Sequence, residues 1–238
     1  MRMRQVWLGM LLMLSALSGA QAQSELPGEI RLASEIWEAY TEADGTGLGW
    51  DVMREVFEPA GVRLDIHSVP YTRSVGLVQR GEADAWVGSY RDEVEGPVFY
   101  PKHHYDRDQI VALGLKDKPV PTLDSLGKYR LVWVRGYGYE EYLPNVHDYR
   151  EVQRRDGILG MLELGHADFY IDARPEFDYI MGRAAKPQQY RVTNLTQLPL
   201  YLGFANTPRG LDQRMAQPIA SGELRPIFER WQQPYPFD

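Results

Sequence analysis

The chain has 238 residues, no cysteine and a formal net charge of −7 at pH 7. The lack of cysteine excludes disulfide bonds and a lipid-modified cysteine behind a signal peptide. The acidic charge argues against nucleic acid or anionic lipid as a partner, although a small ligand can still meet a locally basic pocket. Hydrophobic residues form 44% of the chain, enough for the packed cores of one large domain or two small lobes.

The amino terminus has the pattern of a secretory signal peptide. Arg2 and Arg4 precede the apolar run 6–17, and small residues follow up to Ala22. The run is shorter than the roughly 20 residues that span a bilayer, although an uncleaved anchor is the alternative. We therefore predict that residues 1–22 are a signal peptide cleaved after Ala22, which places the mature protein in the periplasm.

The first part of the mature chain alternates between strand and helix patterns. Short runs of apolar or alternating residues predict strands, and apolar residues at helical spacing predict the helices between them. Loops rich in Gly, Pro and aromatic residues are expected at 34–44 and 94–104. The predicted strands are 29–33, 62–66 and 84–88, and the predicted helices are 51–59 and 74–80.

A second unit with the same alternation follows. The strand 109–115 leads out of the first unit, and a Pro-punctuated connection at 116–121 separates the two. The residues 200–205 read as a strand that returns to the first unit, ahead of two terminal helices. The other predicted strands are 130–134, 149–153 and 169–171, and the predicted helical segments are 122–126, 139–143, 157–164, 175–183, 211–220 and 223–231.

One short phrase occurs in both units. The sequence G-x-A-D stands at 81–84 and again at 165–168, each time after a helical stretch and before an apolar strand. Coincidence is the alternative, since glycine often ends helices, but a repeated helix–Gly–Ala-Asp–strand unit favours two α/β lobes built on one plan. Polar residues follow both strands, so two strand ends that face each other would form a ligand cleft.

The order of several phrases resembles the extracellular solute-binding proteins of family 3, which bind polar amino acids and related solutes. The resemblance covers nearly the whole mature chain. It is carried by Gly49-Trp50-Asp51, the first G-x-A-D phrase, the Thr122–Lys128 entry into the second unit, the Val134–Tyr139 loop and the terminal Gly222–Trp231 segment.

The resemblance implies an α/β, two-lobed fold of the type II periplasmic-binding kind, with a mixed sheet flanked by helices in each lobe. Lobe one would comprise residues 23–110 and 201–238, and lobe two residues 111–200. A ligand would lie between lobes that close by a hinge motion.

An amino-acid ligand needs a cation for its carboxylate, and a guanidinium suits this because it donates two parallel hydrogen bonds. The family places that arginine a few residues after the serine of strand three, but this chain has Gly96 at the ungapped equivalent. We predict that Arg91 or Arg73 serves instead, with Ser89 beside it. The alternative for each arginine is a solvated side chain or an acidic neighbour on the surface.

The ammonium group of such a ligand needs an anion, and Asp172 is at the place where the family carries its ammonium-binding aspartate. A helix N-cap before Pro175 is the alternative for Asp172. Gly136 can offer a backbone N–H to an anion at the following helix. The aromatic residues near strand ends are expected to form the ligand walls, although each could be ordinary core: Trp37, Tyr71, Tyr90, Tyr137 and Tyr139.

Two further sequence patterns give only weak evidence of a functional site. His103-His104 with Asp106 can be drawn as a metal site, but adjacent side chains usually point apart, so a loop without metal is favoured. Asn194-Leu195-Thr196 matches the acceptor pattern for N-glycosylation. An exported bacterial protein is not expected to use it.

We therefore predict a monomeric, non-catalytic receptor without cofactor or nucleic-acid partner. It would capture a small polar, amino-acid-like ligand for an ABC-type transporter or a membrane sensor. Two alternatives remain: a stand-alone sensory or scaffold protein with a diverged pocket, and an enzyme of the cyclohexadienyl dehydratase kind. An enzyme needs a positioned acid or base, for which Glu35, Glu38 and Asp172 are available.

Overall fold

The computed structural model describes residues 26–205 and 210–238. The predicted signal peptide therefore lies outside the described residues. Within these two ranges, no helix is long and apolar enough to cross a membrane.

The first half of the described chain contains four strands and two helices before the chain crosses over. Gly61, in a left-handed conformation, closes the turn between α1 and β2, and Pro70 precedes α2 with its fixed backbone angle. The elements are β1 (Glu29–Ser34), α1 (Leu48–Phe57), β2 (Arg63–Ser68), α2 (Tyr71–Gln79), β3 (Ala85–Ser89) and β4 (Val98–Phe99).

The second half starts on a long strand and ends on a longer one. Between β5 and β6, a reciprocal capping box of Thr122 and Ser125 starts the helical turn Leu123–Lys128. The elements are β5 (Asp106–Leu115), β6 (Leu131–Val134), α3 (Tyr139–Tyr142), β7 (Tyr149–Val152), α4 (Ile158–Glu163), β8 (Phe169–Ala173), α5 (Arg174–Gly182), β9 (Tyr190–Ala205), α6 (Ala216–Ser221) and α7 (Arg225–Arg230).

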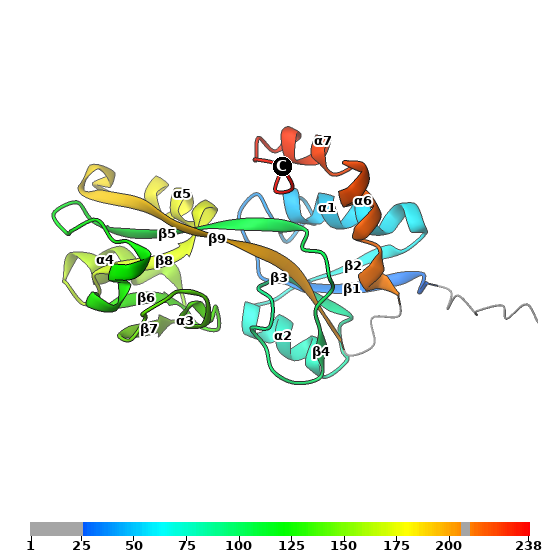
Figure 1. Cartoon of the computed structure of the whole chain (residues 1–238), viewed down its shortest axis with the longest axis horizontal. Helices are drawn as coiled ribbons and strands as arrows, with labels where there is room; N and C mark the ends of the chain where they lie inside the picture. The colour runs from blue at the N-terminus through cyan, green and yellow to red at the C-terminus, as the bar shows by residue number, and fades with distance from the viewer. Residues whose placement is uncertain (1–25, 206–209) are drawn as a thin grey trace, which may run out of the picture.

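The two halves share one topology. The strand order is β2-β1-β3-β9 in the first half and β7-β6-β8-β5 in the second. The first three strands of each set are parallel, and the fourth is antiparallel to its neighbour. Because β5 and β9 also pair with each other, they run between the halves as a two-stranded connection (Figure 1). The predicted two-lobed α/β fold is confirmed.

The strand β9 changes partner where it passes from one half to the other. Leu200 pairs with Asp106 of β5, and Tyr201 pairs with Ser89 of β3. The predicted lobe boundaries at 110 and 200 stay a prediction, but this change of partner gives the hinge a defined place near one of them.

The G-x-A-D phrases occupy equivalent positions in the two halves. Asp84 accepts hydrogen bonds from the backbone N–H and the guanidinium of Arg31, which lies in β1. Asp168 does the same with Arg130, the residue before β6. Both aspartates therefore link the start of one strand to its parallel neighbour by hydrogen bonds. These links lie at the opposite end of the strands from the carboxyl ends, where a ligand would lie.

Replacing Asp168 by asparagine is expected to cost about 1–2 kcal/mol of folding free energy at neutral pH, because a charge-assisted pair with a partly exposed arginine is lost. Burial alone would raise the pKa of Asp168, but hydrogen bonds from the side chain and backbone of Arg130 lower it overall. Its contribution is therefore complete above about pH 4 and is lost as the pH falls through the lowered folded-state pKa.

Urea denaturation of wild type and Asp168→Asn between neutral and acid pH measures this effect. The exposed Asp117 provides the control, since Asp117→Asn should change stability little. An equal cost at neutral and strongly acid pH would mean that the ion pair is not the source.

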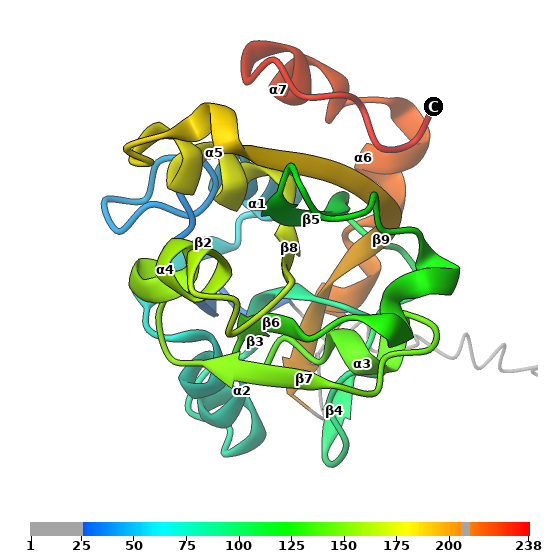
Figure 2. The same cartoon turned by 90° about the vertical axis from the view of Figure 1, so that its left-hand side faces the viewer.

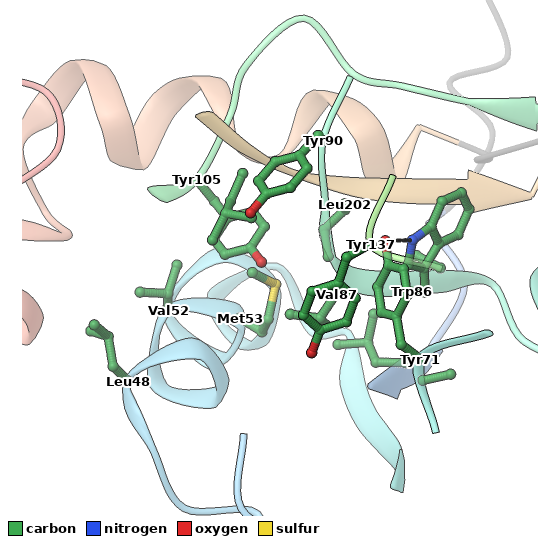
Figure 3. Close-up of a cluster of buried hydrophobic side chains, with 14 of the residues drawn as sticks. Leu48, Val52, Met53, Tyr71, Trp86, Val87, Tyr90, Tyr105, Tyr137 and Leu202 are labelled. Carbon is green, nitrogen blue, oxygen red and sulfur yellow. Dashed lines mark hydrogen bonds between the residues drawn. The ribbon is translucent and has the colours of Figure 1, made fainter. Parts of the chain in front are cut away.

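The hydrophobic core lies on both faces of the sheets. In the first half, Trp86 is fully buried and donates a hydrogen bond to the hydroxyl of Tyr71 over 3.2 Å (Figure 3). In the second half, α4 and α5 lie beside β5 and β8 (Figure 2), where Ile158, Leu162 and Phe177 pack together. Each half therefore buries the apolar side of its own helices.

Several elements differ from the sequence-based expectation. The strand β9 begins at Tyr190, whereas only 200–205 was predicted, because its first part is polar and half-buried and forms a strand only by pairing with β5. The two residues of β4 were expected to be loop, and they are a strand because they pair with β9. The predicted helix 211–220 is broken into the turn Leu211–Gln213 and α6.

Candidate ligand-binding site

A cavity of about 850 Å³ lies between the two halves. Its volume is in the range of small-molecule sites. The loop after β1 and the end of β3 supply its wall from the first half, and α3, the end of β8 and α5 supply its wall from the second. The start of β5 and residues near the carboxyl terminus complete it. The cavity is therefore at the carboxyl ends of parallel strands, as predicted.

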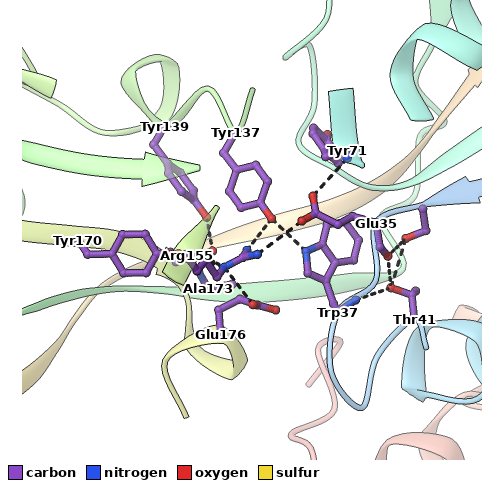
Figure 4. Close-up of polar contacts among 12 residues, drawn as sticks. Glu35, Trp37, Thr41, Tyr71, Tyr137, Tyr139, Arg155, Tyr170, Ala173 and Glu176 are labelled. Carbon is purple, nitrogen blue, oxygen red and sulfur yellow. Dashed lines mark hydrogen bonds and ion pairs between the residues drawn. The ribbon is translucent and has the colours of Figure 1, made fainter. Parts of the chain in front are cut away.

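A single guanidinium organises the second-half side of this site. Arg155, in the turn Arg155–Gly157, forms ion pairs with Asp172 at 3.0 Å and Glu176 at 3.1 Å (Figure 4). It also donates hydrogen bonds to the hydroxyls of Tyr137 at 2.7 Å and Tyr170 at 3.1 Å. The side chain of Arg155 is only 14% exposed, so these contacts replace its hydration.

Burial and ion pairing shift the pKa values of this cluster in opposite directions. Burial alone would lower the pKa of Arg155, but the Asp172 carboxylate and the neighbouring tyrosines raise it well above its usual value. Burial and the Asp172 carboxylate raise the pKa of Glu176, although Arg155 opposes them. Burial likewise raises the pKa of Glu35, again against Arg155. The guanidinium thus partly offsets the effect of burial on the pKa of these two glutamates.

The two halves touch across the site. Arg155 reaches Glu35 of the first half at 3.5 Å, and Trp37 donates its indole N–H to the hydroxyl of Tyr137 at 3.0 Å (Figure 4). The rings of Tyr71 and Tyr137 meet edge to face, with centroids 5.6 Å apart. These contacts would have to break for the halves to separate, so the structure shows the two lobes closed on each other.

A second set of acids lies on the first-half and hinge side. Tyr40 donates to Asp106 over 2.8 Å, and Tyr90 donates to Asp108 over 2.9 Å. Glu93 accepts from the Tyr71 hydroxyl and from the backbone N–H of Tyr90. Burial raises the pKa of Glu93 to about 8 and those of Asp106 and Asp108 to about 7.

Tyrosine hydroxyls connect the two sets of acids. Tyr139 lies 3.5 Å from the Tyr90 hydroxyl and donates to Asp172 over 3.4 Å. A continuous chain of polar contacts therefore runs from Asp108 on β5, through two tyrosines, to the Arg155 cluster. The site is one network rather than separate surface pairs.

The structure brings six of the ten predicted ligand residues to the cavity wall, and their roles toward a ligand stay a prediction. Asp172 is 1% exposed, and the residue at the N-cap of α5 is Ala173, so the capping alternative for Asp172 does not apply. The six residues at the wall are Trp37, Tyr71, Tyr90, Tyr137, Tyr139 and Asp172.

The structure places neither arginine of the predicted carboxylate clamp at the cavity. Arg73 is exposed on α2. Arg91 donates to the carbonyl of Pro101 and lies over the ring of Tyr201, 4.3 Å from its centroid. Its neighbour Tyr90 takes the inward position after β3, which turns Arg91 away. The arginines on the cavity wall are Arg107, Arg174 and Arg183, whereas Arg155 contacts the wall residues Asp172 and Tyr137.

Two more predicted residues lie off the wall. Ser89 is buried and donates to the Tyr90 carbonyl and the Tyr100 hydroxyl. The N–H of Gly136 is taken by Glu151, so it does not face the cavity as an anion donor. Gly136 has a positive φ of 87°, and a Cβ there would lie 2.5 Å from Thr72, so glycine permits this close approach between the halves.

The sequence reasoning missed the second set of acids. Asp106-Arg107-Asp108 opens β5, and alternate residues of a strand point to the same side, so both aspartates face inward. Asp106 was considered only with the adjacent histidines. The ring of His104 stacks on Phe237 with centroids 4.9 Å apart, and among the described residues no group of three possible metal ligands is found.

Searches against family models and against curated proteins give no match. Solved structures do match. The GluR0 ligand-binding core with L-glutamate is 15% identical, with 85% of this chain and 97% of that chain covered and a TM-score of 0.69. The chain has the two-lobed fold of these ligand-binding proteins.

Two other structures show how widely this fold is used. A Streptococcus pneumoniae ABC uptake transporter substrate-binding protein with bound histidine is 17% identical, with 88% and 93% of the chains covered and a TM-score of 0.66. A histidine kinase sensor domain with similarity to periplasmic binding proteins is 14% identical, with 85% and 95% covered and a TM-score of 0.68. The predicted resemblance is thus confirmed at the level of the fold.

Proposed function

We propose that the protein is a periplasmic solute-binding protein that captures a small polar, amino-acid-like ligand between its two lobes. The cavity between the halves carries this proposal, because both halves supply polar and aromatic side chains to it and two strands connect them as a hinge. The role is binding, without catalysis or a cofactor, and the protein acts as a monomer.

The bound protein would then be recognised at a membrane. The likeness to a transporter substrate-binding protein supports delivery to an ABC-type transporter, as predicted. The likeness to a histidine kinase sensor domain supports the second candidate, a sensor that reports the ligand to a membrane partner. Both roles need the same closed, ligand-bound form, so one binding experiment tests what they share.

Thermal unfolding of the mature protein with amino acids, amines and small carboxylates is expected to reveal a ligand that raises the melting temperature. At a free concentration of about 100 times the Kd, binding adds about 2.7 kcal/mol of stability. Ala173 lies on the cavity wall at the end of β8. A tryptophan at this position fills the cavity, so Ala173→Trp should abolish the shift.

Leu164 provides the matched control because it is 72% exposed at the end of α4, far from the wall. Leu164→Trp should keep the full ligand shift. A ligand that stabilises Ala173→Trp as strongly as wild type would bind outside the cavity and contradict the proposed function.

A further inference from the structure

The charges around the cavity are unbalanced. Six carboxylates take part in the hydrogen bonds and ion pairs described above, and Arg155 is the only guanidinium that these contacts place among them. Glu38 and Asp178 also line the cavity. Arg155 already pairs with three of the six. The paired acids are Glu35, Asp172 and Glu176, and the others are Glu93, Asp106 and Asp108.

Of the two aspartates of β5, Asp106 is buried and Asp108 is half-buried. Asp106 is 8% exposed, and it accepts hydrogen bonds from the Tyr40 hydroxyl and the backbone N–H of Arg107. Asp108 accepts from the Tyr90 hydroxyl. Within the described ranges, no ion pair involves either residue. Two carboxyls side by side in a cavity without a counter-charge are costly, and a cationic ligand would relieve that cost.

Three further arginines line the cavity, Arg107, Arg174 and Arg183. Arg107 and Arg183 are exposed, and Arg183 lies over the ring of Tyr179, 3.7 Å from its centroid. Arg174 donates to the side chain of Asn194. Arg155 is held by its three acids and two hydroxyls. None of these guanidinium groups is therefore placed to clamp a carboxylate beside Asp106 and Asp108.

The walls next to the two aspartates are aromatic. Tyr40 and Tyr90 carry the hydroxyls that bond the carboxylates, and Tyr139 lies beside Tyr90 with ring centroids 6.0 Å apart. Aromatic faces attract ammonium groups, and most strongly where water is excluded. The carboxylates and the ring faces would therefore both stabilise a bound ammonium group.

We propose that the cavity binds an aliphatic diamine, with one ammonium group held by Asp106 and Asp108 between the tyrosine rings. This rests on the proposed function and narrows its ligand to a class that resembles a basic amino acid without its carboxylate. The second ammonium group contributes the further positive charge that the excess of acids demands.

Proton linkage gives this proposal a signature. Burial raises the pKa of Asp106 and Asp108, and the Asp106 and Asp172 carboxylates raise that of Asp108 further. Burial raises the pKa of Tyr40 and Tyr90 well above 10, so these hydroxyls stay protonated while Asp106 and Asp108 titrate near pH 7. Because ammonium binding favours charged carboxylates, protons leave on binding and affinity rises from about pH 6 to about pH 8.

Calorimetric titration of the mature protein with cadaverine and with lysine isolates the carboxylate, because cadaverine is lysine without that group. We expect cadaverine to bind at least about tenfold more tightly than lysine, with proton release seen by comparing two buffers of different ionisation enthalpy. Asp108→Asn should weaken cadaverine at least about tenfold, while the melting temperature without ligand stays the same or rises. The exposed control Asp117→Asn should leave binding unchanged.

The outcomes separate this inference from the proposed function. Tighter binding of lysine, glutamine or glutamate that Ala173→Trp abolishes would overturn the diamine and leave the solute-binding role intact. Cadaverine binding that survives Ala173→Trp or Asp108→Asn would overturn the assigned site. Failure of every compound class to bind would overturn both.

Discussion

Replacing Arg155 by alanine will cost about 3–5 kcal/mol of folding free energy, the largest loss expected of any single change at the site. The guanidinium is 14% exposed and pairs with Asp172, Glu176 and Glu35. Its removal leaves the buried Asp172 and Glu176 and the half-buried Glu35 without this cation. Chemical denaturation followed by tryptophan fluorescence measures the loss.

The defect should depend on pH in a stated direction. Burial already raises the folded-state pKa of Glu176 and Glu35 while Arg155 opposes it. Without Arg155 these acids hold protons in the folded state that they release on unfolding. Stability of the variant therefore falls as the pH rises through their raised pKa values, and the cost shrinks in acid.

Arg80 supplies the matched control for this experiment. It forms a charged pair with Glu82 on the surface, where its side chain is 56% exposed. Arg80→Ala should change stability far less than Arg155→Ala at any pH, because an exposed pair contributes little. If Arg155→Ala costs no more than Arg80→Ala, then Arg155 is not the centre of the site.

Replacing Gly203 by alanine is the second large effect, at about 1–3 kcal/mol or more. Gly203 lies in β9 opposite Trp86 of β3, and a Cβ at this position would lie 2.1 Å from the indole ring. The ring is fully buried and bonded to Tyr71, so it has little room to move. Thermal unfolding should show a clearly lower melting temperature.

The control for Gly203→Ala is Gly160, an exposed residue of α4 with open space around its Cα. Alanine has the higher helix propensity, so Gly160→Ala should raise stability by about 0.5–1 kcal/mol. Opposite signs for the two substitutions are the expected result. If Gly203→Ala does not lower the melting temperature, the indole of Trp86 does not pack against Gly203 of β9.

The repeated phrase predicted two α/β lobes, and the family resemblance supplied their type II arrangement. G-x-A-D encodes local events, a helix end before Gly81 or Gly165 and a strand start just after Asp84 or Asp168. Both recur in the structure with the same kind of arginine contact. Local patterns also gave most strands. The first part of β9 was missed because its polar residues form a strand only through non-local pairing with β5.

The site was predicted only in part, for a similar reason. The tyrosines and Asp172 lie near the ends of strands or the starts of helices, so their positions can be inferred from local patterns. Arg155 is in a short turn beside Arg154, and the choice of which arginine is buried depends on Asp172 and Glu176, which come later in the chain. Arg91 was a poor choice because the outward turn after Tyr90 is set by Pro101 and Tyr201.

Hydrogen-exchange mass spectrometry with and without a saturating ligand tests most directly whether the cavity between the lobes is the binding site. We expect ligand to slow amide exchange in segments of both halves and of the hinge at the same time. Exchange at the distant α4 surface should not change. The segments expected to be protected are 35–41, 88–93, 106–109, 137–140 and 172–179. Protection confined to one half, or to a surface away from these segments, would contradict the account.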